Sequence, residues 1–156
     1  MKIGIVGLGF VGLSLTSVLA SKGYDIIGID IDKEKCEKIR NGISPFFEPE
    51  LEKLLKNGLK KKLKIVSDFL LIKNCDFIFV TVGTPQNTNG SINLSIIKKA
   101  ISKIGENLEK NKKNPIILVK IQDLILIQNL FLLFYLISFL KLAKYLSSLF
   151  LELQYF

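Results

Sequence analysis

The sequence contains no histidine, no tryptophan and only two cysteines in 156 residues. Without histidine, a Ser-His-Asp or Cys-His catalytic relay of the usual kind is excluded, and so is the commonest ligand of transition metals. Cys36 and Cys75 do not form a C-x-x-C pair, so neither a disulfide framework nor a cysteine-rich zinc site is predicted. These absences argue against most hydrolase chemistry and against a metal site, and they favour a reducing, cytoplasmic environment.

The formal net charge is +8, from 22 Lys and Arg against 14 Asp and Glu. Such a charge is compatible with a nucleic acid, a membrane surface or a phosphorylated ligand. The positive residues gather in short runs at 60–64 and 110–113, without interleaved aromatics or a basic helix face. They are therefore interpreted as solvated surface, and nucleic acid is not expected as a partner. Glycines interrupt the apolar segment after Met1, so no secretory signal is expected.

The composition changes abruptly near residue 120. All eleven Gly, all four Pro and all seven Val lie in residues 1–120, whereas residues 121–156 have none of these and contain twelve Leu and five Phe. The last 36 residues carry four charged side chains, those of Asp123, Lys141, Lys144 and Glu152. We therefore predict a domain at residues 1–120, followed by an apolar and mainly helical tail at residues 121–156.

Residues 1–120 alternate between short apolar runs and longer amphipathic segments. The apolar runs predict strands at Lys2–Val6, Asp25–Ile29, Lys64–Val66, Asp76–Val82 and Ile116–Val119. Helical periodicity predicts helices at Phe10–Lys22, Asp32–Asn41, Glu50–Asn57, from Ser67 or Asp68 to Lys73, and Leu94–Lys110. Gly23, Gly42 and Gly58 are expected to follow the ends of three of these helices. The alternation predicts an α/β fold with a parallel sheet and right-handed crossovers.

The segment Gly7–Gly12 (G-L-G-F-V-G) follows a predicted strand and opens a predicted helix. The pyrophosphate of a dinucleotide needs a tight turn, a backbone that it can approach without an intervening Cβ, and a helix N-terminus whose N–H groups face the anion. Gly7, Gly9 and Gly12 are expected to provide the turn, the close approach and the close packing of helix on strand, in that order.

Asp30 ends the next predicted strand, 18 residues after Gly12. An acid at this position accepts hydrogen bonds from the adenine ribose and repels the 2′-phosphate of NADP, so NAD is the predicted cofactor. The alternative is a glycine turn with an acidic helix cap at Asp30 or Asp32 and no ligand. The order of strand, turn, helix, strand and acid favours the NAD site.

Two other features are open to a functional or a structural interpretation. Thr84 and Pro85 follow the fourth predicted strand, at the sheet edge where ligands of open α/β sheets bind. Their backbone is a candidate border of the cofactor, and an ordinary strand-ending turn is an equal alternative. Cys36 and Cys75 are expected to pack as small apolar side chains rather than to act as nucleophiles.

Four sequence blocks together resemble the N-terminal domain of the UDP-glucose/GDP-mannose 6-dehydrogenases. The blocks are M-K-I-G-I-V-G-L-G-F-V-G-L at 1–13, G-I-D-I-D at 28–32, S-P-F-F-E-P-E-L at 44–51 and T-V-G-T-P at 81–85. They occur in the order and spacing of that family. The second pair of blocks distinguishes it from other NAD-dependent dehydrogenases, such as 3-hydroxyacyl or 6-phosphogluconate types. The resemblance implies a Rossmann-type, doubly wound parallel sheet.

Enzymes of this family oxidise the C6 alcohol of a nucleotide sugar to a carboxylate, reduce two NAD and pass through a thioester on a cysteine. The resemblance implies that the glycine motif holds the pyrophosphate and that Asp30 and Lys35 hold the adenosine end. It also implies that residues 82–86 border the cofactor. The cofactor-binding residues so predicted are Gly7, Leu8, Gly9, Phe10, Val11, Gly12, Asp30, Lys35, Val82, Thr84 and Pro85.

This chain departs from the family in three places. Glu50 stands where the family usually has the glycine of E-P-G-L, and Asn93 where an aspartate is common. After Lys120 the family continues with S-T-V-P-P-G-T, whereas this chain continues with I-Q-D-L. The family's nucleophilic cysteine, catalytic lysine and C-terminal domain have no counterpart, so no catalytic residue is assigned.

Three explanations are compatible with the tail. A shifted reading frame in an A/T-rich gene accounts for the lost resemblance and for the absence of Gly and Pro, and we prefer it. A transmembrane anchor at 124–140 has the required length, but it contains Gln128 and Asn129 and adjoins Asp123. The third explanation is an apolar helix that packs on the sheet or on a partner.

The sequence thus predicts the NAD-binding domain of a cytoplasmic nucleotide-sugar 6-dehydrogenase, an oxidoreductase of polysaccharide biosynthesis. The chain alone is expected to be inactive, and a nucleotide sugar is expected as a ligand of intact relatives only. The alternative is a non-catalytic NAD-binding module whose C-terminal helix associates with a membrane or with a partner.

Overall fold

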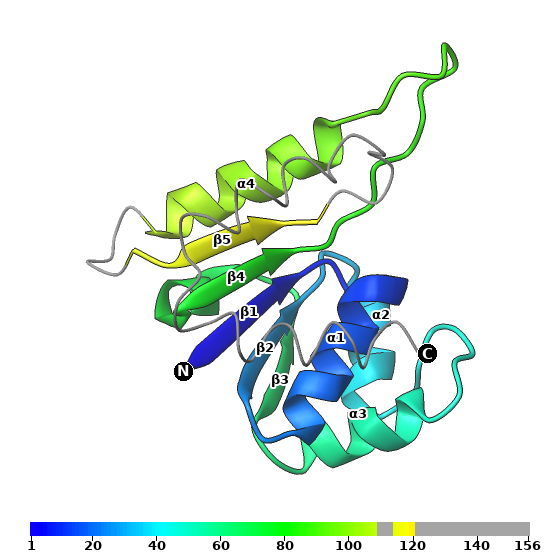
Figure 1. Ribbon diagram of the computed structural model, residues 1–156, viewed down its shortest axis with the longest axis vertical. Helices are drawn as coiled ribbons and strands as arrows, with labels where there is room; N and C mark the ends of the chain where they lie inside the picture. The colour runs from blue at the N-terminus through cyan, green and yellow to red at the C-terminus, as the bar shows by residue number, and fades with distance from the viewer. Residues whose placement is uncertain (109–113, 121–156) are drawn as a thin grey trace, which may run out of the picture. The chain divides into compact units, whose positions relative to one another are not determined.

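Five parallel strands form one sheet in the order β3-β2-β1-β4-β5 (Figure 1). The computed structural model describes residues 1–108 and 114–120. Its strands are β1 (Lys2–Val6), β2 (Asp25–Ile29), β3 (Leu63–Val66), β4 (Phe77–Val80) and β5 (Ile116–Val119). Strand β1 lies at the centre and pairs Ile3 with Ile26 of β2 and with Phe77 of β4. The order and direction of the strands confirm the predicted Rossmann-type sheet.

Helices cover both faces of the sheet. They are α1 (Phe10–Ser21), α2 (Lys33–Arg40), α3 (Leu51–Leu59), the short 3₁₀ helix η1 (Leu70–Asn74) and α4 (Ser95–Leu108). In Figure 1, α1, α2 and α3 lie on one side of the sheet and α4 lies on the other. The chain therefore leaves β1 and β4, which are neighbours, toward opposite faces. This switch point, at the carboxyl ends of the strands, is where open α/β sheets bind their ligands.

Successive side chains of a strand point to opposite faces of the sheet, and apolar side chains form a buried layer on each face. On the α4 side, strand residues pack with η1, α4 and the segments beside them; this cluster consists of Val6, Ile27, Ile29, Phe69, Ile72, Cys75, Ile78, Val80, Ala100 and Ile104. The opposite face of β1 and β2 carries Ile3, Ile5 and Ile26, all buried. Because both faces are covered, these strands are apolar along nearly their whole length.

Glycines end two of the helices as predicted, but not the third. Gly23 (φ +93°) and Gly42 (φ +74°) take left-handed conformations just after α1 and α2. The prediction for Gly58 is wrong, because α3 continues through it to Leu59. A Cβ on Gly58 would lie 2.6 Å from the Cβ of Ala20 in α1, so this glycine allows α1 and α3 to pack closely.

Two other elements are shorter than predicted. The helix expected from Ser67 or Asp68 is the 3₁₀ helix η1, which begins at Leu70. The Leu70 N–H donates a hydrogen bond to Asp68 Oδ1 (2.9 Å). The strand expected at Asp76–Val82 is confined to β4, although the Thr81 N–H still donates to the Val6 oxygen of β1 (2.8 Å).

The predicted tail at 121–156 and the last residues of the predicted helix Leu94–Lys110 lie outside the described residues. The three explanations of the tail therefore stay predictions, as does the domain boundary. In the part of the chain that the structure describes, no helix is both long and apolar enough to cross a membrane.

Candidate functional site

The chain turns sharply between β1 and α1 at Gly7. Its φ of +96° lies in the region that favours glycine. A Cβ at this position would lie 2.9 Å from both Cγ1 and N of Val82. The Gly7 N–H donates to the carbonyl oxygen of Ile29 (2.8 Å), which ties the turn to the end of β2. Both the backbone angle and the lack of space therefore require glycine here.

Gly12 lies in the first turns of α1 and faces the same turn. A Cβ on Gly12 would overlap the carbonyl oxygen of Gly7 and would lie 2.6 Å from Oγ1 of Thr81. Without that Cβ, the start of α1 lies directly against the ends of β1 and β4. The predicted role of Gly12 in packing helix on strand is confirmed.

Gly9 differs from the other two glycines, because the fold does not require it. Its φ of −76° and ψ of −165° are extended angles that any residue adopts. Apart from its chain neighbours, no atom of the described residues lies within 4 Å of the place that a Cβ would take. Gly9 is the N-cap of α1. The Leu13 N–H donates to the Gly9 oxygen (2.9 Å), and the N–H groups before Leu13 have no intrahelical acceptor. The open space thus lies at a helix N-terminus, which attracts anions.

Asp30 lies directly after β2 and reaches the glycine turn. Its Oδ2 accepts hydrogen bonds from the Leu8 N–H (2.8 Å) and from the Lys35 ammonium (2.9 Å), and its Oδ1 accepts one from the Asp32 N–H (3.0 Å). The residue is only 8% exposed. The structure therefore brings together the acid, the lysine and the motif that the sequence placed far apart.

The carboxyl group of Asp30 is charged at neutral pH. Burial raises its pKa, but the hydrogen bonds from the Asp32 N–H, the Lys35 ammonium and the Leu8 N–H outweigh burial and hold the pKa below its ordinary value. The Lys35 side chain is partly exposed and comes from α2, whose N-cap is Asp32. A buried negative charge thus stands beside the turn, with an accessible ammonium next to it.

Thr81 fastens the glycine turn to β4, a role that the sequence analysis did not assign. Its hydroxyl lies 2.8 Å from the Gly7 oxygen and 3.1 Å from the Val6 oxygen, and its N–H donates to the Val6 oxygen (2.8 Å). The T-V-G-T-P block included this residue. A threonine after a strand carries no signal that its hydroxyl reaches the neighbouring strand, so only the pairing of β1 with β4 identifies it.

The loop after β4 runs along the same edge of the sheet. Val82 contacts the glycine turn, as the short distances from a Gly7 Cβ indicate. Thr84 is nearly buried, whereas Pro85 is exposed and its carbonyl oxygen accepts a hydrogen bond from the Asn93 N–H (2.8 Å). The structure thus places Val82 against the motif, and Thr84 and Pro85 farther along the loop.

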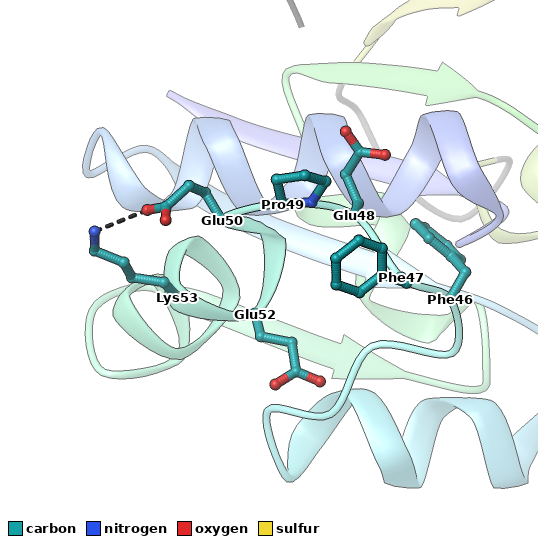
Figure 2. Close-up of a pocket in the computed structure, with 7 residues that line it drawn as sticks. All are labelled: Phe46, Phe47, Glu48, Pro49, Glu50, Glu52 and Lys53. Atoms are coloured by element: carbon teal, nitrogen blue, oxygen red, sulfur yellow. Dashed lines mark hydrogen bonds and ion pairs between the residues drawn. The ribbon is translucent and has the colours of Figure 1, made fainter.

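The structure describes the surroundings of both internal departures from the family pattern. Glu50 has a φ of +62°, a left-handed angle that favours glycine, and it is the N-cap of α3. Its carboxylate pairs with the Lys53 ammonium (2.7 Å), as Figure 2 shows. Asn93 Oδ1 accepts a hydrogen bond from the Ser95 N–H (2.9 Å) at the start of α4. Since an aspartate offers the same acceptor, asparagine preserves this contact.

Neither described cysteine is placed to act as a nucleophile. Cys36 and Cys75 are fully buried, which confirms the predicted packing role. Burial raises the pKa of the Cys36 thiol, whose sulfur lies 3.3 Å from the Asp30 carbonyl oxygen. A thiol that is buried and has a raised pKa is unreactive.

Comparison with known proteins agrees with this geometry. Residues 1–121 match the model of the UDP-glucose/GDP-mannose dehydrogenase family, NAD binding domain. The chain belongs to this family. The Rossmann-type unit is therefore the NAD-binding domain characteristic of this family, and NAD is its cofactor.

Relatives of this NAD-binding domain are much longer than the chain. The GDP-mannose 6-dehydrogenase of Pseudomonas syringae pv. tomato is 40% identical over 120 residues, which are 75% of this chain and 27% of that protein. An uncharacterised protein of Methanocaldococcus jannaschii is 38% identical over 118 residues, 76% of this chain and 13% of that protein. This chain thus spans less than a third of either protein.

Solved structures show the same relationship. A ternary complex of GDP-mannose dehydrogenase from Pseudomonas aeruginosa has a TM-score of 0.77 and 33% identity, and the match covers 83% of this chain and 30% of that chain. A UDP-glucose dehydrogenase from Pyrobaculum islandicum has a TM-score of 0.74 and 26% identity, covering 77% of this chain and 28% of that one. The similarity is therefore to one part of each enzyme.

Proposed function

We propose that the carboxyl edge of the sheet around β1 and β4 holds NAD. The first-turn N–H groups of α1 bind the pyrophosphate, Asp30 and Lys35 bind the adenosine ribose, and the loop after β4 borders the cofactor. When bound, NAD supplies a nicotinamide that accepts a hydride. The residues assigned to this site are Gly7, Leu8, Gly9, Phe10, Val11, Gly12, Asp30, Lys35, Val82, Thr84 and Pro85.

The observation that carries this proposal is the open space at Gly9. Gly7 and Gly12 are glycines because the fold would clash without them, but a side chain at Gly9 would meet no atom of the described protein. Glycine at this N-cap leaves the backbone open to the close approach of a ligand. The space lies at the N-terminus of α1, where an anionic pyrophosphate finds unpaired N–H groups.

Asp30 and Lys35 support binding at the adenosine end. Oδ1 of Asp30 accepts one hydrogen bond, from Asp32, and a carboxylate oxygen accepts a second. Lys35 uses one of the three N–H donors of its ammonium on Asp30 and keeps the others for a hydroxyl. A 2′-phosphate would meet the charged Asp30 carboxylate, so NAD is expected to bind more tightly than NADP.

Replacing Gly9 tests the proposal directly. In Gly9→Ser, a good N-cap residue places its side chain in the open space, so we expect unchanged stability and a loss of NAD affinity of about tenfold or more. Isothermal titration calorimetry on the full chain measures the affinity. Gly105→Ser is the matched control, because Gly105 also has open space around it but lies in α4. Equal NAD affinity in wild type and Gly9→Ser would refute the assigned site.

We further propose that the domain serves the oxidation of a UDP- or GDP-sugar at C6, and that this chain alone does not complete that reaction. The buried cysteines support the second statement, because a thioester intermediate needs an accessible thiolate. With NAD and either UDP-glucose or GDP-mannose, we expect no rise in NADH absorbance above the rate without sugar. A steady rise that depends on the nucleotide sugar would contradict this proposal.

A further inference from the structure

Phe10, the first residue of α1, does not point into the core. It is 57% exposed, and its ring packs against that of Phe46, with 5.1 Å between the ring centroids and a tilt of 38°. Phe46 belongs to the segment that connects α2 with α3, which is distant in sequence from the glycine motif. An aromatic side chain from another segment thus lies beside the helix N-terminus to which the pyrophosphate site is assigned.

The segment around Phe46 is held in a defined conformation. The Ser44 hydroxyl donates to the Phe46 carbonyl oxygen (2.6 Å), and the Ser44 N–H donates to the Glu52 carboxylate of α3 (3.1 Å). Figure 2 shows the Phe46 ring at one end of a surface pocket and the ion pair between Glu50 and Lys53 at the other. Phe46 is therefore placed by α3 and presented to α1.

We infer that Phe46 is a positioning residue for the dinucleotide, acting through its contact with Phe10. The two rings form an apolar wall beside the first turn of α1 and exclude water from it. Electrostatic attraction between N–H groups and a phosphate increases as the surrounding dielectric falls. The wall therefore strengthens the hydrogen bonds to the pyrophosphate without touching the adenosine end. This inference rests on the proposed NAD site.

Phe47 provides a matched control in the same segment. Its ring is 91% exposed, and among the described residues the ring contact of Phe10 is with Phe46. Replacing Phe47 therefore removes the same number of atoms from the same segment but leaves the wall intact. If loss of any phenyl ring in this segment weakened binding equally, the cause would lie in the segment and not in the wall.

Titrations of the full chain with NAD and with adenosine test the inference. Adenosine reaches the Asp30 end but has no pyrophosphate. We expect Phe46→Ala to weaken NAD binding about threefold to tenfold and to leave adenosine binding unchanged. Phe47→Ala should match wild type with both ligands. Phe46→Leu, which keeps an apolar side chain without the ring, should lie between wild type and Phe46→Ala.

The outcomes separate this inference from the proposed function. If wild type and Phe47→Ala bind NAD and Phe46→Ala binds it equally well, the wall has no role and the NAD site stands. If Phe46→Ala and Phe46→Leu lose NAD and adenosine affinity in equal proportion, the contact is merely structural and the inference is overturned. If wild type does not bind NAD, both fail. A Phe10→Ala/Phe46→Ala double variant should be no weaker than Phe10→Ala, since Phe46 acts through the Phe10 ring.

Discussion

Each glycine of the motif has a different physical cause. Gly7 has a left-handed backbone angle, Gly12 has no room for a Cβ, and Gly9 has neither constraint. The spacing of the motif predicted all three positions, because turn, approach and helix packing follow one another along a single segment. The contacts of Leu8 with Asp30 and of Thr81 with Gly7 were not predictable in this way, since they depend on which strands pair and in which register.

Asp30 links the stability of the fold to pH. Its pKa is lower in the fold than in the unfolded chain, so the charged carboxylate stabilises the fold above the unfolded-state pKa of about 4. This stabilisation is lost as the pH falls through the lower, folded-state pKa. Asp30→Asn removes the charge and leaves the Lys35 ammonium without its partner. At neutral pH we expect a loss of about 1–3 kcal/mol in the free energy of unfolding.

Urea unfolding of both proteins at neutral pH and at about pH 3 measures this effect. The difference between wild type and Asp30→Asn should shrink at the acidic pH, because below the unfolded-state pKa the wild type no longer gains the full stabilisation of the charged carboxylate on folding. Asp25→Asn is the control, because Asp25 lies at the other end of β2 and makes a half-exposed ion pair with Lys2. A difference that is the same at both pH values would mean that the charge of Asp30 does not stabilise the fold.

At the scale of elements, the sequence was most informative where a boundary has a local cause. Apolar runs located every strand, and Gly23 and Gly42 located two helix ends, because a left-handed residue stops a helix wherever it occurs. The prediction that Gly58 ends α3 was wrong, because the reason for a glycine at this position lies in another segment of the chain. Its missing Cβ makes room for Ala20 of α1, and a single segment gives no sign of the helix that packs against it.

Glu50, at the start of α3, has a left-handed backbone angle. A left-handed angle costs a residue with a side chain about 1–2 kcal/mol. Glycine avoids this cost, but it makes the unfolded chain more flexible, and this offsets part of the gain in the free energy of unfolding. We therefore expect Glu50→Gly to raise the free energy of unfolding by about 0.5–1 kcal/mol, measured by urea or thermal unfolding. Glu50→Ala is the control, since it removes the ion pair with Lys53 but keeps a Cβ. If both variants are equally stable, the backbone angle at Glu50 carries no strain.

At the scale of the whole molecule, the described residues make one NAD-binding unit, and the chain spans less than a third of the P. syringae enzyme. The cofactor site that we propose at the carboxyl edge of the sheet combines a helix N-terminus with open space, a buried carboxylate and a loop from the neighbouring strand. The amino-acid composition changes near residue 120, because all Gly, Pro and Val residues lie before that point.

Mapping NAD onto the full chain by two-dimensional ¹H–¹⁵N NMR tests the proposed site most directly. On titration with NAD, the largest chemical-shift changes should occur at the amides of Gly9, Phe10 and Val11, with smaller ones beside Asp30 and in 82–84. The amide of Asp25, at the opposite end of β2, should not move. No change at saturating NAD, or changes centred on the lysine-rich segment 60–64, would mean that the glycine turn is only architecture and that NAD does not bind at this edge.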